Sequence, residues 1–119
     1  MRAKNTSVVK ACRVLTVTLP ADSDAETLFA LQKQVWLAMA RYQVEGLIMD
    51  ASALARLNPF FAWMVGAAAR KVALTGGRTV VAGMQASVAV NTTRWGLNWA
   101  NVLMAPDVDR ALEVLKADG

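Results

Sequence analysis

The residues that enzymes use for acid–base and nucleophilic chemistry are scarce in this sequence. It contains no histidine, which removes the most common general base and the most common metal ligand. Its single cysteine, Cys12, is expected to be a packed, unreactive thiol in a reducing compartment. Asp50 is the one acid expected at the carboxyl end of a strand, where α/β folds place function, and one acid does not define a reaction. We therefore expect no enzymatic activity, no cofactor and no metal site.

An anion could bind where a helix is expected to begin, at Asn58 and Pro59. Proline is favoured at the first position of a helix, and asparagine caps exposed N–H groups. Arg56 lies close by, and an arginine beside a helix N-terminus can bind a phosphate, a nucleotide or a carboxylate. A solvated arginine and a purely structural helix start explain the same residues, so both interpretations stay open.

Aromatic residues on the helix that follows Pro59 are candidates for binding another protein. Its residues fall on two neighbouring faces: Phe60, Trp63, Ala67 and Arg70 on one, and Phe61, Val65, Ala68 and Val72 on the other. The second face is the better candidate for the core, because a helix on a sheet buries one broad stripe. Exposed aromatic side chains on the first face would anchor an interface, and burial by adjacent helices is the alternative.

Two further tryptophans, Trp95 and Trp99, lie on either side of Gly96. They would either fill gaps at the end of a helix or extend a binding surface. The sequence contains four tryptophans in 119 residues, which favours an interface.

These residues are carried by strands and helices that alternate along the chain. Five strands are expected, at 7–10, 13–19, 46–50, 78–82 and 102–104, with 46–50 apolar enough to be buried on both faces. Four helices are expected, at 24–42, at 59–73, at 85–95 and from 107 to about 115. The first of them has an apolar stripe that consists of Leu28, Leu31, Val35, Met39 and Tyr42. The order ββαβαβαβα predicts one α/β domain over residues 1–119, with a mostly parallel mixed sheet covered by helices.

The charge distribution is uneven although the net charge is only +4. No acidic residue lies between Asp50 and Asp107, whereas five basic residues do: Arg56, Arg70, Lys71, Arg78 and Arg94. This basic segment lacks a nucleic-acid recognition motif, so a nucleic acid is the less favoured partner. Neither a secretory signal nor an apolar run of membrane-spanning length is present, and we expect a cytoplasmic protein.

The element order resembles the STAS domain, the fold of anti-sigma-factor antagonists. The segment Gly46-Leu-Ile-Met-Asp-Ala-Ser-Ala-Leu54 resembles the family's strand that ends in aspartate followed by a small polar pair. The segment Val80-Val-Ala-Gly-Met-Gln-Ala-Ser-Val-Ala89 resembles a conserved run of the stressosome scaffold proteins RsbS and RsbR. The resemblance covers roughly residues 7–115 and implies a role in signalling, stress response and transcription regulation.

The sequence departs from that family at its phosphorylation sites. The family has an acid and then a phosphorylated serine or threonine at the start of the second helix, where this chain has Asn58 and Pro59. RsbR-type proteins carry a second phosphorylated threonine in the third helix, where this chain has Asn91 followed by Thr92 and Thr93. The resemblance therefore implies that the first switch is missing, and Thr92 and Thr93 are the alternative targets.

Taken together, the residues and the resemblance predict a regulatory protein-interaction module with its partner surface at Phe60, Trp63, Ala67 and Arg70. The expected partners are a serine-kinase-type regulator or STAS paralogues. We expect a homo- or hetero-oligomer and no association with a membrane. Two alternatives stay open. One is a STAS module that binds an anion or nucleotide near Arg56 and Pro59, and the other is a nucleic-acid binder that uses the basic middle segment.

Overall fold

A five-stranded sheet forms the centre of the protein. The computed structural model describes residues 7–11, 13–20, 25–54, 59–85 and 102–117. The strands lie in chain order: β1 (Ser7–Ala11), β2 (Val14–Thr18), β3 (Gly46–Asp50), β4 (Arg78–Ala82) and β5 (Val102–Ala105). β1 pairs antiparallel with β2, and β2 to β5 are mutually parallel. The expected mostly parallel mixed sheet is confirmed.

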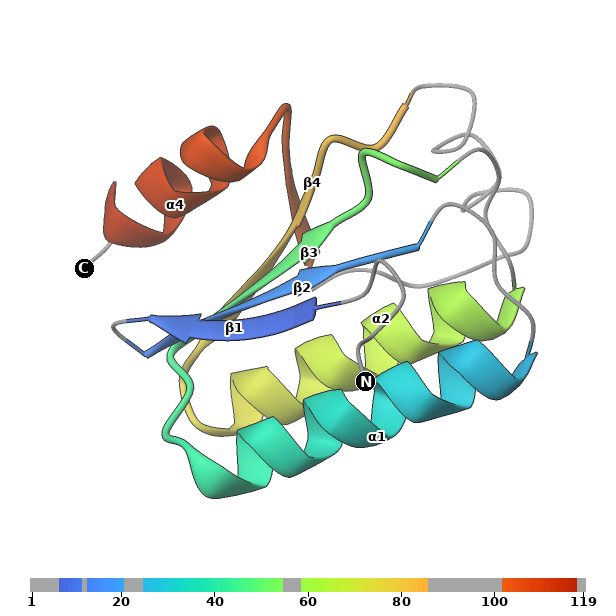
Figure 1. The fold of residues 1–119 in the computed structure, drawn as a ribbon. Coiled ribbons are helices and arrows are strands. Elements are labelled where there is room, and N and C mark those ends of the chain that lie inside the picture. Colours follow the sequence, from blue (N-terminus) through green and yellow to red (C-terminus); the bar gives the residue numbers. More distant parts are fainter. Residues whose placement is uncertain (1–6, 12, 21–24, 55–58, 86–101, 118–119) are drawn as a thin grey trace.

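Helices cover both faces of this sheet (Figure 1). α1 (Ala25–Arg41) and α2 (Pro59–Leu74) lie side by side on one face, and α4 (Val108–Ala117) lies on the other. α1 and α2 run in the same direction, so both begin at the edge where the parallel strands end. The helix expected at 85–95 falls in residues 86–101, outside the described part of the chain.

The larger apolar core lies between the sheet and the pair α1 and α2. Successive residues of a strand point to opposite faces, and Leu47 and Met49 of β3 accordingly pack on this side. Ile48, between them, packs on the other side, so β3 is buried on both faces as predicted. The helices contribute the apolar positions that the sequence pattern assigns to the core, namely Leu28, Leu31, Val35, Val65, Ala68 and Val72.

The smaller core lies beneath α4. It contains Ile48, Val80, Ala82, Ala105 and Ala111, with Val108, Leu112 and Leu115 of the helix packed against it. Asp107 caps the helix as predicted, because its Oδ1 accepts a hydrogen bond of 2.8 Å from the backbone N–H of Arg110. The Asp107 cap thus sets the start of α4, and its apolar residues set the face that packs on the sheet.

The connection between β1 and β2 differs from the expected one. A strand beginning at Arg13 was predicted, but Ala11 pairs with Val14 and the strand begins at Val14. Arg13 has φ of 67°, in the left-handed region that a two-residue hairpin connection requires. Because glycine or asparagine usually occupies such a position, the sequence carried no signal for it. Cys12 lies outside the described residues.

The end of α1 also corrects a prediction. Tyr42 was placed on the buried stripe of the helix, but α1 ends at Arg41 and Tyr42 is 40% exposed. The Tyr42 N–H still donates a 2.9 Å hydrogen bond to the Ala38 carbonyl and closes the last turn of the helix, but its side chain is exposed to solvent. Met39, one turn earlier, is half-buried against the core.

α2 ends at a glycine pair, as predicted. Gly76 has φ of 84°, and its N–H donates a 3.0 Å hydrogen bond to the Ala73 carbonyl. The Gly77 N–H donates to the Val72 carbonyl at the same distance. A Cβ atom on Gly77 would lie 2.5 Å from Val72 Cγ1 and 2.8 Å from the Glu45 backbone oxygen. Only glycine fits this close approach.

Candidate functional site

Asp50 stabilises a turn at the carboxyl end of β3. Its Oδ1 accepts hydrogen bonds from the Ser52 N–H at 3.1 Å and from the Ser52 hydroxyl at 2.8 Å. The neighbouring Ala51 N–H donates to the Ala82 carbonyl of β4 at 2.8 Å. The two bonds to Asp50 fix the turn, and the third extends the pairing of β3 with β4 by one residue. Within the described residues, no three acidic, cysteine or histidine side chains come together as a metal site would require.

The start of α2 lies at the same end of the molecule. Pro59 is exposed and is the first residue of the helix, as predicted. Arg56 and Asn58 lie in 55–58, outside the described residues, as do Asn91, Thr92, Thr93, Trp95 and Trp99 in 86–101. The anion site at Arg56 and the alternative phosphorylation sites therefore stay predictions.

The face of α2 chosen as a partner surface is open to solvent in its central part. Trp63 is 50% exposed and Arg70 is exposed, whereas Ala67 is half-buried and Phe60 packs partly against the core. The neighbouring face carries the fully buried Val65, Ala68 and Val72. The predicted inner face is confirmed for these three residues, and the predicted outer face is exposed at Trp63 and Arg70 but half-buried at Phe60 and Ala67. The side chain of Phe61 lies outside the described part.

Three aromatic rings form one partly exposed cluster across α1 and α2. The ring centroids of Phe29 and Phe60 are 5.1 Å apart, and those of Phe60 and Trp63 are 5.9 Å apart. Both separations fall in the range of favourable tilted ring pairs. Phe29 is 59% exposed, so the cluster presents much of its surface to solvent. We call Phe29, Phe60 and Trp63 the aromatic surface.

Phe29 was not among the predicted site residues. It lies outside the buried stripe of α1, and a single exposed phenylalanine on a helix is common in soluble proteins. Its importance arises only because α1 and α2 begin side by side, which brings it against Phe60. The pairing of the two helices, rather than any local motif, would have revealed it.

Three of the five basic residues of the middle segment, Arg70, Lys71 and Arg78, lie in the described part of the chain. Arg78 is half-buried, and its Nη2 donates to the carbonyls of Val114 and Leu115 at the end of α4. Lys71 Nζ lies 5.3 Å from the ring centroid of Trp36. Arg70 is exposed on α2, seven residues after Trp63. Arg78 is thus engaged within the fold, whereas Arg70 and Lys71 are exposed; the nucleic-acid alternative, which needs a continuous basic patch, stays a prediction.

None of the helices in the described part of the chain combines the length and hydropathy that a membrane crossing would require. Comparison by sequence gives no relatives: no family model matches this chain, and no curated protein matches it either. Comparison of structures is informative, because solved structures share the fold over nearly the whole chain.

The architecture is that of STAS-domain proteins. A Ser-to-Glu variant of RsbS from Moorella thermoacetica aligns with a TM-score of 0.85 and 20% identity, over 96% of this chain and 97% of that one. The unphosphorylated anti-sigma factor antagonist SpoIIAA aligns with a TM-score of 0.80 and 15% identity, over 94% and 96%. A chain of the stressosome aligns with a TM-score of 0.76 and 22% identity, over 93% and 96%. The STAS fold expected from the sequence is confirmed.

Proposed function

We propose that this chain is a regulatory protein-interaction module of the anti-sigma-factor-antagonist or stressosome-scaffold kind, which acts by binding rather than by catalysis. The observation that carries the proposal is the aromatic surface, in which the exposed rings of Phe29 and Trp63 both pack on the partly buried ring of Phe60, because exposed aromatic rings are typical anchors of protein interfaces. The fold supports it, since the same fold occurs in an anti-sigma factor antagonist and in the stressosome. The partner is a serine-kinase-type regulator or a STAS paralogue.

The proposed surface extends along α2 from Pro59 to Arg70. Trp63 lies at its centre, with Phe60 and Phe29 on one side. α2 has no acidic residue in its sequence, so its exposed charges, Arg70 and Lys71, are both positive. A partner that covers the rings would therefore meet a basic rim at the end of the helix away from Pro59.

Replacing Trp63 with alanine tests this surface. We expect the variant to weaken assembly or partner binding by at least about tenfold, the loss typical of a central interface tryptophan. Self-association is measured by size-exclusion chromatography with light scattering, and binding to purified STAS paralogues and serine kinases of the same organism by biolayer interferometry. Leu37→Ala is the matched control, because Leu37 is an exposed apolar residue of α1 outside the aromatic surface.

Thermal and urea unfolding of both variants complete the test. Truncation of a fully buried tryptophan costs about 3–5 kcal/mol, and a half-exposed one costs less. A loss of about 3 kcal/mol or more in the Trp63 variant would place this residue in the core and refute the proposed surface. Unchanged assembly and partner binding, together with wild-type stability, would refute it as well.

The missing hydroxyl at the start of α2 gives a second test. A cognate kinase is expected to leave residues 58 and 59 unmodified, because asparagine and proline have no hydroxyl to accept a phosphate. Phosphopeptide mapping by mass spectrometry after incubation with the kinase would show whether Thr92 or Thr93 is modified instead. The variant Pro59→Ser restores a hydroxyl at the exposed first position of α2, and its phosphorylation at residue 59 would show that the kinase docks here.

A further inference from the structure

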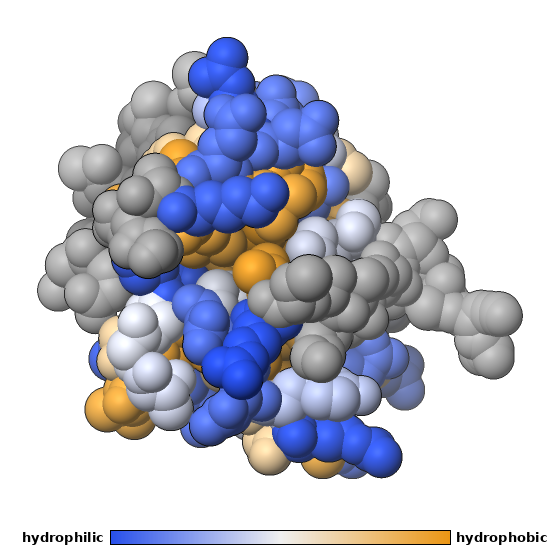
Figure 2. Space-filling view, turned by 90° about the vertical axis from the view of Figure 1, so that its left-hand side faces the viewer, coloured by the Kyte–Doolittle hydropathy of each residue, from blue (hydrophilic) through white to orange (hydrophobic). Residues whose placement is uncertain are grey.

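A cavity lies at the end of the molecule opposite Pro59, where α1 and α2 end. Its volume is about 560 Å³, within the usual range of small-molecule sites. It is lined by the last turns of α1 and α2 and by the connection from α1 to β3, residues 42–45. Figure 2 views this end of the molecule and shows hydrophilic residues interspersed with hydrophobic surface. The cavity is thus separate from the aromatic surface at the other end of the helices.

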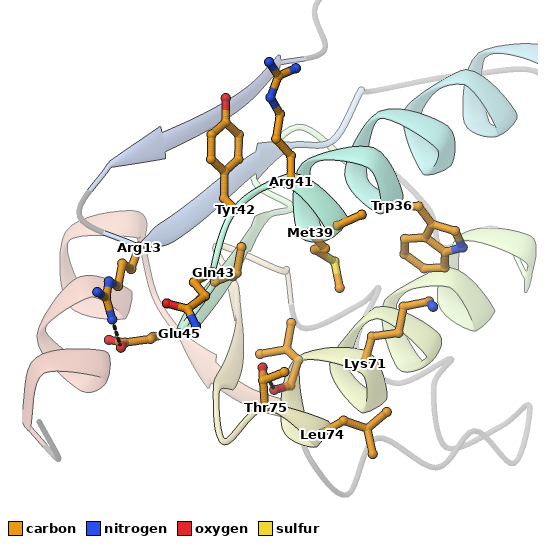
Figure 3. A pocket seen from close by; sticks show the side chains of 13 residues that line it. Arg13, Trp36, Met39, Arg41, Tyr42, Gln43, Glu45, Lys71, Leu74 and Thr75 are labelled. Carbon is orange, nitrogen blue, oxygen red and sulfur yellow. Dashed lines mark hydrogen bonds and ion pairs between the residues drawn. The ribbon is translucent and has the colours of Figure 1, made fainter.

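Apolar side chains form part of the walls of the cavity. Trp36 and Met39 of α1, Val44 of the connection, and Val72 and Leu74 of α2 line it. Figure 3 shows Trp36 and Lys71 facing each other on one wall, with the Lys71 Nζ 5.3 Å from the ring centroid. Such walls suit the apolar part of a ligand, either a flat ring or a short alkyl chain.

The charges in the cavity favour an anion. Its only acid, Glu45, is neutralised by Arg13, whose Nη1 lies 2.8 Å from the Glu45 Oε2. Lys71 has no carboxylate partner within the described residues, and its contact with Trp36 leaves its N–H donors available. Arg41 lines the rim but points away from the other side chains in Figure 3. One uncompensated positive charge therefore faces the apolar walls.

The carboxyl-terminal end of α2 disfavours an anion in the cavity only weakly. The last carbonyls of a helix carry partial negative charge, which favours cations. At the end of α2 the Val72 carbonyl already accepts hydrogen bonds from the Thr75 and Gly77 N–H groups, and the Ala73 carbonyl accepts one from Gly76. These bonds reduce the partial charge that reaches the cavity, whereas the ammonium of Lys71 keeps its full charge.

We propose that this cavity binds a small organic acid, with its apolar body against Trp36 and Met39 and its carboxylate at Lys71. The lysine would leave its position over Trp36 to donate charge-assisted hydrogen bonds to the carboxylate. The ring of Trp36 would then be free to contact the ligand. This site requires no protein partner, and it shares Lys71 with the basic end of the partner surface proposed above.

Titration of the full ¹⁵N-labelled chain, followed by NMR, tests the site. The probes are octanoate and indole-3-acetate, each compared with its uncharged amide. We expect shift changes at the amides of residues 43–45 and at the Trp36 indole N–H, and about tenfold tighter binding of the acids than of the amides. Lys71→Gln should weaken acid binding about tenfold and remove the preference over the amides, whereas Lys71→Arg should retain it.

Lys116→Gln is the matched control, since it removes one exposed positive charge on α4, across the sheet, and should bind as the wild type does. Circular dichroism confirms that each variant is folded. The proposal is overturned if no acid shifts these signals at concentrations up to about 10 mM. Equal binding of acids and amides, or shift changes that cluster at the Pro59 end of α2, would overturn it too.

Discussion

Thr79 offers a sharp test of how the sheet is stabilised. It lies in β4, is fully buried, and its Oγ1 has no hydrogen-bond partner within the described residues. Its side chain points to the same face of the sheet as Val81, toward the larger core. A buried hydroxyl without a partner costs about 1–3 kcal/mol in proteins. We therefore expect that replacing Thr79 with valine stabilises the domain.

The expected gain follows from the two atoms exchanged. Valine replaces the hydroxyl with a methyl group, which removes the cost of the unpaired oxygen and buries one more apolar group, worth about 0.8 kcal/mol. The methyl group is larger than the hydroxyl, and crowding in the close-packed interior offsets part of this gain. We expect a net increase of about 1–2 kcal/mol in the free energy of unfolding, or about 4–8 °C in Tm.

Urea and thermal unfolding followed by circular dichroism measure this change. Thr75→Val is the control with the opposite sign, because the Thr75 hydroxyl donates a 3.0 Å hydrogen bond to the Val72 carbonyl, and its loss should cost about 1 kcal/mol. Thr79→Ser keeps the hydroxyl and removes the methyl group, so it should also destabilise. A Thr79→Val variant less stable than the wild type would refute the reasoning and show that the hydroxyl is satisfied in solution.

Two further changes test local features of the fold. Gly77→Ala should destabilise by at least about 2 kcal/mol in urea unfolding, because the new Cβ would collide with Val72 Cγ1 and with the Glu45 backbone; wild-type stability would show that the chain relaxes at this point. Arg78→Gln should lower stability by about 1–2 kcal/mol and increase hydrogen exchange in α4, since the arginine donates a 2.7 Å hydrogen bond to the Val114 carbonyl at the end of that helix; exchange unchanged in α4 would contradict this assignment.

The features that local chemistry determines were predictable from the sequence. β3 was recognised because a short, continuous apolar run fits a parallel strand buried on both faces. Both ends of α2 followed from Pro59 and from the glycine pair after Leu74. The start of α4 followed from Asp107, whose side chain caps the first turn. In each case one residue type has a strong conformational or hydrogen-bonding preference at its position.

The features that depend on tertiary placement were not predictable. Arg13 adopts a left-handed conformation that its residue type does not favour, because the hairpin connection imposes it. Phe29 joins the aromatic surface only because α1 and α2 lie in parallel, side by side. The cavity brings together Trp36 and Lys71, which lie on different helices, and no local spacing links them. Of the aromatic surface, Phe60 and Trp63 on α2 could therefore be predicted from the sequence, and Phe29 on α1 could not.

The rings of Phe29 and Trp63 rest on the outside of helices whose inner faces are filled by aliphatic side chains. If the aromatic surface binds the partner as proposed, substitutions at these two positions would change what the domain recognises while leaving the aliphatic packing beneath them intact. Gene duplicates that share this architecture could thus diverge in specificity without passing through unstable intermediates. Several such domains in one cell could then each bind a different partner because they differ at a few exposed aromatic residues.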